Sequence, residues 1–266
     1  MTDHRDRPMP ILANKHHSEA SAFEPGNLLR EARRHEGLAV RDVPAICVLD
    51  PDGDLVRRLR QDGRATTDRD WACYHSELDR FVEGDVEFGI VGCVVGASYA
   101  VLVAEQFFAA GCRLLISMTS SGQLQPVRPP PYFILIEQAL RDEGTSYHYL
   151  PPSDFAQADT GVIAALESAF DGMREPVLRG ATWTTDAPFR ETERAIATMT
   201  ARGLLAVEME AAALYAFAQA CGKRAVCFAH VTNQMGHVNG SRSSCRSSSR
   251  EGPCRAVAPA SGLGAF

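Results

Sequence analysis

Two carboxylates, Glu208 and Glu210, flank Met209 inside an otherwise apolar run at residues 203–222. An ionised carboxylate is costly to bury without a partner, so each of the two needs a reason for its place. One interpretation is structural, because free N–H groups and the helix dipole favour negative charge at a helix start. The other is functional: one carboxylate faces a pocket and accepts hydrogen bonds from a polyhydroxylated ligand. These residues alone leave both interpretations open.

The composition around the carboxylates predicts the elements that position them. Residues 204–207 are apolar and suit a short buried strand, and residues 209–220 are rich in Ala and suit a helix. Glu210 is therefore expected near the junction between this strand and this helix.

The sequence AVEMEAA at 206–212 resembles the V-E-M-E-A-A signature of the nucleoside phosphorylase family. That family includes purine nucleoside and uridine phosphorylases and their nucleosidase relatives. The resemblance implies that Glu210 holds the ribose 2′- and 3′-hydroxyls, that Met209 packs against the sugar, and that Glu208 supports them. Glu210 is then a catalytic as well as a ribose-binding position.

A strand at 43–49, an acidic loop containing Gly53 and a helix follow one another early in the chain. This order presents backbone N–H groups to an anion. Gly53, Asp54 and Arg57 resemble the family's G-D-x-x-R element, which implies that Gly53 and Arg57 bind phosphate. Leu55 stands where the family has Pro. The alternative is an ordinary turn with a surface Arg.

The sequence SMTSSG at 117–122 resembles the family's phosphate-gripping R-x-G-[ST]-x-G. Ser120 and Gly122 match and are implied to bind phosphate. Ser117 stands where phosphorolytic members have Arg, and Thr119 stands where they have Gly. The alternative is a Ser/Thr-rich loop with no ligand.

The exchange at Ser117 matters because a bidentate guanidinium holds phosphate strongly, and a hydroxyl cannot replace its charge. Either another arginine supplies the charge, with Arg57 and Arg128 as candidates, or the nucleophile is not phosphate.

A base-binding element is implied after the strand at 177–185, where Asp186 and Phe189 resemble the family's D-x-[FY]-[FY]. The family's aromatic stacks on the base, and such stacking is worth roughly 1–3 kcal/mol in nucleic-acid binders. Arg194 falls at the spacing of the Arg that reads a pyrimidine in uridine-type members, and Thr192 replaces their Gln. Plain core packing of Phe189 is the alternative.

Asn233 is the second candidate catalytic residue, because it follows the predicted strand at 224–231, where purine-cleaving members carry a catalytic Asp. That Asp protonates the purine as general acid. Asn233 cannot donate a proton in this way, and uridine-type members use polar contacts instead. The resemblance therefore favours a pyrimidine over a purine.

Strands and helices alternate along the chain, which predicts a layered α/β domain. The resemblance implies a three-layer α/β/α fold with a central mixed sheet. Gly96, Ala97 and Ser98 resemble the family's G-P-S turn at the start of a helix. Strands are expected at 43–49, 88–95, 113–118, 146–150, 177–185, 204–207 and 224–231, and helices at 27–34, 99–110, 132–141, 160–170 and 209–220.

Three segments are expected: an N-terminal arm and helix at 1–42, a nucleoside phosphorylase-like domain at 43–235, and a tail at 236–266. The tail is rich in Ser, Arg, Gly and Pro, and such a composition cannot bury enough apolar surface to fold. The change of composition suggests the hypothesis that the tail is disordered, or aberrant through a frame shift or truncation. An aberrant tail would leave the activity of this copy uncertain.

The net charge of −6 gives no sign of a nucleic-acid partner, and no apolar run of about 18 residues predicts a membrane span. The N-terminus lacks an apolar signal core. Eight cysteines show no CxxC spacing, which predicts a cytoplasmic protein. Four of them lie in apolar runs and are interpreted as reduced core thiols: Cys47, Cys93, Cys112 and Cys227.

The resemblance implies cleavage of the N-glycosidic bond of a nucleoside by phosphorolysis, giving free base and ribose 1-phosphate. A uridine-like substrate is favoured, and the enzyme would be a pentosyltransferase. Neither metal nor organic cofactor is expected, and inorganic phosphate is the co-substrate. A homo-oligomer is implied, built from dimers or a trimer or hexamer. Hydrolysis by a nucleosidase and a catalytically decayed nucleoside-binding paralogue are the alternatives.

Overall fold

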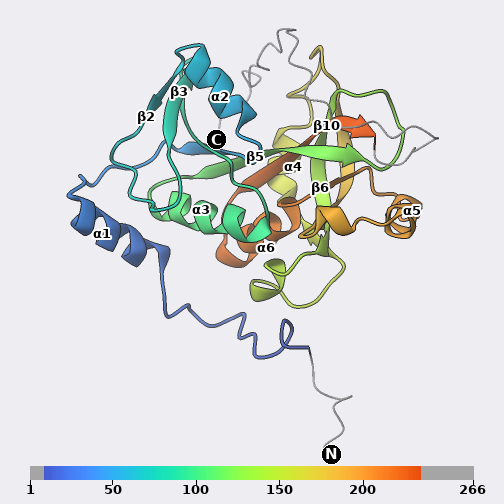
Figure 1. The fold of residues 1–266 in the computed structure, drawn as a ribbon, viewed down its shortest axis with the longest axis horizontal. Helices are drawn as coiled ribbons and strands as arrows, with labels where there is room; N and C mark the ends of the chain where they lie inside the picture. Colours follow the sequence, from blue (N-terminus) through green and yellow to red (C-terminus); the bar gives the residue numbers. More distant parts are fainter. Residues whose placement is uncertain (1–8, 235–266) are drawn as a thin grey trace, which may run out of the picture.

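The computed structural model describes residues 9–234 of the 266-residue chain (Figure 1). The expected tail at 236–266 lies outside the described residues. The elements in chain order are α1 (Pro25–Glu36), β1 (Ile46–Asp50), α2 (Asp54–Gln61), β2 (Ala65–Thr67), β3 (Asp79–Glu83), β4 (Val86–Gly92), α3 (Ala97–Ala109), β5 (Leu114–Gln123), β6 (Tyr132–Asp142), the 3-10 helix η2 (Ser146–His148), β7 (Phe155–Gln157), α4 (Thr160–Ala165), β8 (Val177–Thr185), the 3-10 helix η3 (Pro188–Arg190), α5 (Glu193–Ala201), β9 (Ala206–Glu208), α6 (Ala211–Cys221) and β10 (Ala225–Gln234).

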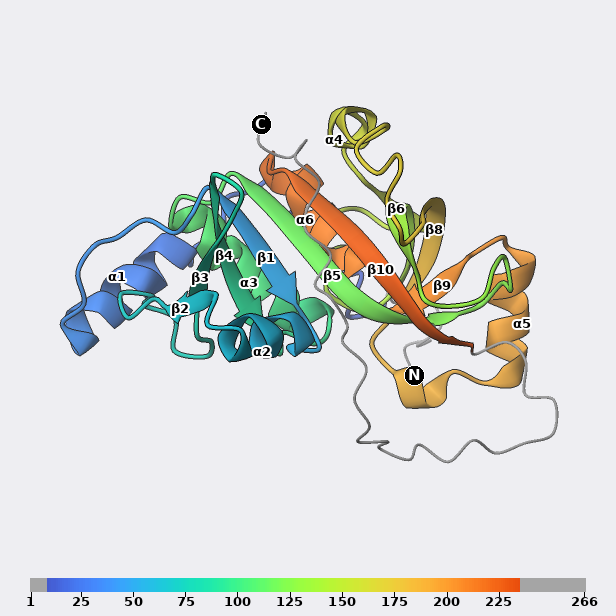
Figure 2. The same ribbon diagram turned by 90° about the horizontal axis from the view of Figure 1, so that it is seen from above.

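The strands form one mixed sheet in which β5 is shared by two parts. In the first part, β1 lies between β4 and β5 and is parallel to both. In the second part, β5, β10, β6, β8 and β9 pair in succession, and β9 pairs back with β5, so these five strands form a closed ring. Figure 2 shows β5 and β10 running side by side along their length.

Helices lie on both sides of the sheet. In Figure 1, α3 and α6 lie below it and α2 lies above it. Every residue of β1 is buried, as expected of a parallel strand covered on both faces. Helix α6 is buried from Ala211 to Ala218, because it is apolar on all sides and not on one face alone. The expected α/β fold with a central mixed sheet is therefore confirmed.

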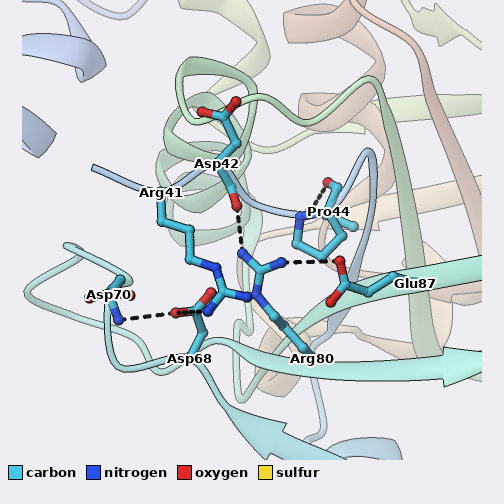
Figure 3. A network of polar contacts seen from close by, with 8 residues as sticks. Arg41, Asp42, Pro44, Asp68, Asp70, Arg80 and Glu87 are labelled. Atoms are coloured by element: carbon cyan, nitrogen blue, oxygen red, sulfur yellow. Dashed lines mark hydrogen bonds and ion pairs between the residues drawn. The ribbon is translucent and has the colours of Figure 1, made fainter. Parts of the chain in front are cut away.

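Arg80 anchors the hairpin of β2 and β3, which the sequence did not predict (Figure 3). Its guanidinium pairs with Asp68 and with Glu87, and it also donates a hydrogen bond to the carbonyl of Asp42. Arg80 thus ties the loop that connects β2 and β3 to both β4 and the segment that precedes β1.

Two element types were wrong. Residues 132–141, expected to be a helix, form strand β6, which is antiparallel to β10 and parallel to β8. Most of β6 is buried on both faces, so its apolar run carries no period that separates a strand from a helix. Residues 146–150, expected to be a strand, contain the 3-10 helix η2.

Two further differences are smaller. Helix α4 ends at Ala165, whereas the prediction extended to residue 170. Cys93, expected in the core, is exposed, while Cys47, Cys112 and Cys227 are buried free thiols as expected.

Candidate active site

Glu208 ends β9 and is fully engaged by protein groups. Its side chain is buried, and its Oε2 accepts hydrogen bonds from the backbone N–H groups of Glu210 at 2.7 Å and Ala211 at 2.8 Å. Its Oε1 accepts hydrogen bonds from the hydroxyls of Thr182 and Thr184. Burial raises the pKa of Glu208, and these hydrogen bonds oppose the rise. Glu208 therefore fixes the start of α6, as the structural interpretation of these carboxylates expected for one of them.

Glu210 is in a different position, although only one residue separates the two. It is 1% exposed, and its Oε1 accepts a hydrogen bond from the backbone N–H of Gly96 at 2.7 Å. Its Oε2 has no partner among the described residues. A buried carboxylate oxygen without a donor is expensive, which is the situation expected of a group that awaits hydroxyls from a ligand.

Burial, and after it the charge of Glu208, raises the pKa of Glu210 to about 8. The Gly96 N–H and the nearby hydroxyl of Thr119 act in the opposite direction. Without a ligand, Glu210 therefore holds a proton at neutral pH. A sugar that donates its hydroxyls to this carboxylate favours the ionised form and lowers its pKa.

Three elements meet at Glu210. Gly96 belongs to the turn that opens α3, Thr119 lies on β5, and Met209 precedes Glu210 and is half-buried. Gly96 has a φ of 92°, a conformation that suits glycine, so the turn can aim its N–H at the carboxylate. The structure thus joins two motifs that the sequence analysis could align only separately.

The expected phosphate-binding residues meet around Asp52. The backbone N–H of Ser120 donates to Oδ2 of Asp52 at 2.9 Å, and the Ser120 hydroxyl donates to Oδ1 at 3.0 Å. Arg57 donates to the carbonyl of Asp52 at 3.0 Å and pairs with Asp54. Gly53 opens α2 with a φ of 73°. Sequence reasoning missed Asp52, although the D-P-D-G-D run already showed how acidic this loop is.

Asp50 and Cys93 also contact the segment that contains Gly53 and the start of α2. Oδ2 of Asp50 accepts a hydrogen bond from the N–H of Val56 at 2.9 Å, and burial raises the pKa of Asp50 to about 6. A Cβ at Gly53 would lie 2.7 Å from Sγ of Cys93, so no side chain fits there without displacing the thiol. Arg57 brings a guanidinium into contact with this loop.

The other residues considered for phosphate have different surroundings. Ser117 is buried in β5, and its hydroxyl has no partner in the described part of the chain. Arg128 stacks its guanidinium on the ring of Tyr132, with Cζ 5.9 Å from the ring centroid. Gly122 pairs with Asn233 at the far end of the β5–β10 ladder, where a register shift follows Val231.

The expected base-binding residues lie on η3 and α5. Phe189 is 100% exposed, so its alternative role in core packing is wrong. The Thr192 hydroxyl accepts a hydrogen bond from the N–H of Ala195 at 3.2 Å and thereby caps α5. Arg194 is exposed on the first turn of α5. Their contacts with a base remain predictions.

His230 is a further titratable residue that sequence reasoning missed. It pairs with Ser120 in the β5–β10 ladder, and paired residues of parallel strands face the same side of a sheet. Its ring stacks on Phe133 with centroids 4.6 Å apart. Burial lowers the pKa of His230, and the charges of Asp52 and Asp54 oppose this. His230 and Ser120 lie side by side because of the strand register, and this register cannot be read from the sequence.

A mixed sheet with helices on both sides (Figure 1) defines an α/β protein, and comparison with known proteins shows its family. The chain belongs to the phosphorylase superfamily, whose family model matches residues 44–249. The resemblance to the nucleoside phosphorylase family is thereby confirmed.

Two curated relatives share about half of the chain. A DeoD-type purine nucleoside phosphorylase of Myxococcus xanthus is 31% identical over 131 residues, which are 48% of this chain and 54% of that protein. A guanosine phosphorylase of Halorubrum lacusprofundi is 27% identical over 131 residues, 49% of this chain and 54% of that protein. The chain thus matches about half the length of these relatives.

Solved structures of a uridine phosphorylase from Vibrio fischeri share the fold. One has a TM-score of 0.62 at 18% identity and covers 74% of this chain and 81% of that chain. A second, in complex with 6-hydroxy-1-naphthoic acid, has the same TM-score and identity and covers 77% and 82%. At this identity, the likeness concerns the fold alone.

Two features are absent from residues 9–234. No helix there combines the length and hydrophobicity of a membrane crossing. No group of three or more His, Cys, Asp or Glu side chains in that range is arranged around a metal position.

Proposed function

We propose that this protein cleaves the N-glycosidic bond of a nucleoside and transfers the ribosyl group to phosphate, giving free base and ribose 1-phosphate. The observation that carries the proposal is the buried carboxylate of Glu210, whose Oε2 has no partner among the described residues. Membership of the phosphorylase superfamily supports the same chemistry.

Glu210 would accept hydrogen bonds from the ribose hydroxyls and would become ionised as they bind. Its negative charge would then lie close to a ribosyl group that gains positive charge as the bond to the base breaks. A fixed charge of this kind stabilises a transition state because it needs no rearrangement at the moment of reaction. The turn at Gly96 and the capped start of α6 hold the carboxylate in place.

The nature of the base is the finer part of the proposal. Asn233 stands where purine-cleaving members have an acid, and this supports a uridine-like substrate. The names of the two curated relatives support a purine as the second candidate. Phe189, Arg194 and Thr192 are proposed to contact the base.

Hydrolysis is the second candidate for the reaction itself. It is favoured by Ser117, which brings no positive charge to β5, and by Asp52, which already occupies the donors of Ser120. In that case, water would take the ribosyl group.

A nucleoside panel tests the proposal. Purified protein is incubated with uridine, cytidine, inosine and guanosine, with and without phosphate, and free base, ribose and ribose 1-phosphate are separated by chromatography. Base release that requires phosphate supports phosphorolysis, and base release with free ribose in its absence supports hydrolysis. If no nucleoside releases base under either condition, the enzymatic proposal is wrong, and the chain at most binds nucleosides.

A further inference from the structure

The carboxylate of Asp52 engages the donors that the phosphorylase resemblance assigns to phosphate. Both of its oxygens are used, one by the backbone N–H of Ser120 at 2.9 Å and one by the Ser120 hydroxyl at 3.0 Å. An N–H and an O–H that converge on two oxygens of one anion would suit two oxygens of a phosphate equally well. The two residues are 68 positions apart, so this contact joins the β1–α2 loop to β5.

The cation of this loop is also engaged by the loop itself. Arg57 donates to the carbonyl of Asp52 at 3.0 Å and forms an ion pair with Asp54. Residues 50–57 contain three carboxyl groups, those of Asp50, Asp52 and Asp54, and one guanidinium, that of Arg57. A phosphate that approached Ser120 would meet carboxylates of its own sign where its charge needs cations.

The contact between Asp52 and Ser120 is accessible to a competitor. Both residues are exposed, whereas Glu210 is buried. A hydrogen-bonded pair at the surface exchanges its partners for water or for a solute at little cost. Asp52 can therefore leave Ser120 without opening the core.

We propose that Asp52 is a built-in competitor of phosphate, whose carboxylate holds Ser120 until phosphate displaces it, and that it thereby sets the affinity of this protein for phosphate. This inference rests on the proposed function, because it takes Ser120 and Arg57 as the phosphate-binding groups. Asp52 is then a specificity-determining residue, because it discriminates between phosphate and water as acceptors of the ribosyl group.

The test measures binding of inorganic phosphate directly, by isothermal titration calorimetry without nucleoside. Asp52→Asn keeps the size of the side chain and removes its charge, and Asp52→Ser shortens it as well. Asp62→Asn is the matched control, because it removes the same charge from the surface pair with Arg58 at the other end of α2. Circular dichroism melting curves confirm that each variant is folded.

Both Asp52 variants are expected to bind phosphate about tenfold more tightly than the unmodified protein, which corresponds to about 1.4 kcal/mol. The Asp62 variant is expected to stay within about twofold of the unmodified protein. Equal or weaker binding by the two Asp52 variants, or an equal gain in the control, overturns the inference. The calorimetry measures phosphate binding and not turnover. An inactive protein would therefore contradict the proposed function, but the effect of Asp52 on phosphate binding could still be measured.

If the protein is a phosphorylase, the same variants give a second readout. The KM for phosphate should fall in the Asp52 variants by about the factor seen in calorimetry, while the KM for the nucleoside stays unchanged. A change confined to the nucleoside KM would place Asp52 at the sugar or base and not at phosphate, against the inference.

Discussion

The backbone N–H of Gly96 donates a hydrogen bond to Oε1 of Glu210 at 2.7 Å, across 114 positions of sequence. This bond links the turn between β4 and α3 to the start of α6. It holds one oxygen of a buried carboxylate and leaves the other without a partner in the described residues. One oxygen of the carboxylate, Oε1, is thus held by the protein, and the other, Oε2, is available to a ligand.

Glu210→Gln is expected to lower kcat/KM for the best nucleoside by about a hundredfold or more, because hydrogen bonds to a charged group contribute about 1.5–3 kcal/mol each. The amide offers one acceptor oxygen where the carboxylate offers two. Steady-state kinetics on the panel substrate measures the loss. Asp62→Asn serves as control and should retain full activity. Near-normal turnover in the Gln variant would remove Glu210 from the site.

The pH dependence of kcat/KM reports on the same group. The pKa of Glu210 is raised to about 8, and the ionised form is the better acceptor for sugar hydroxyls. We therefore expect kcat/KM to rise with pH up to about 8 and then to level off. A profile that is flat between about pH 6 and 9 would contradict this assignment.

Glu208 and Glu210 are expected to affect stability with opposite signs. Glu208→Gln leaves an N–H of α6 or a threonine hydroxyl without its acceptor and should cost about 2–4 kcal/mol. Glu210→Gln removes a buried acid and should raise the free energy of unfolding. Since the pKa of Glu210 is raised when folded, the unmodified protein loses stability as pH rises from about 4.5 to about 8. The advantage of the Gln variant should grow across that range.

Urea denaturation of the two Gln variants at pH 5 and pH 8 measures these differences. Two variants that lose stability equally at both pH values would show that Glu210 is as fully paired as Glu208.

Gly53→Ala is expected to destabilise the protein by about 2–4 kcal/mol, because it combines a left-handed residue with a clash. A Cβ at Gly53 would lie 2.7 Å from Sγ of Cys93 and 2.9 Å from Nη1 of Arg57. Gly63→Ala is the matched control, since its φ of 65° is similar and no atom lies within 4 Å of its added Cβ. The control should lose about 1 kcal/mol in the same urea titration. Equal losses in the two variants would mean that the loop moves aside without resistance.

Phe189→Ala is expected to raise the KM for the nucleoside about tenfold and to leave the Tm within about 1 °C, since stacking on a base is worth roughly 1–3 kcal/mol. Complete exposure of Phe189 means that its removal opens no cavity. Val127→Ala, another exposed apolar residue, is the control and should change neither quantity. An unchanged KM in the Phe189 variant would exclude it as the base platform.

Local patterns in the sequence predicted much of the fold. Strand β8 occupies the predicted residues 177–185, and α6 begins within two residues of its predicted start. These elements have clear signals in β-branched residues and in alanine. Strand β6 was missed because burial on both faces removes the alternation that marks a strand.

Residues of the candidate site could be predicted only where a single local motif contains them. The AVEMEAA sequence located Glu210, but the different roles of the two carboxylates depend on Thr182, Thr184 and Gly96, which come from elsewhere in the chain. The contact between Asp52 and Ser120 was invisible for the same reason. No local pattern encodes a distance between side chains 68 positions apart.

Strand β10 is the last strand of the described chain, yet it pairs with β5 on one side and β6 on the other. During synthesis from the N-terminus, β5 and β6 are complete long before the strand that separates them exists. Their unpaired backbone groups are then open to other chains, a recognised route to aggregation. Newly made protein should therefore depend on chaperones until residues 225–234 have emerged, and truncation before Ala225 should yield insoluble material.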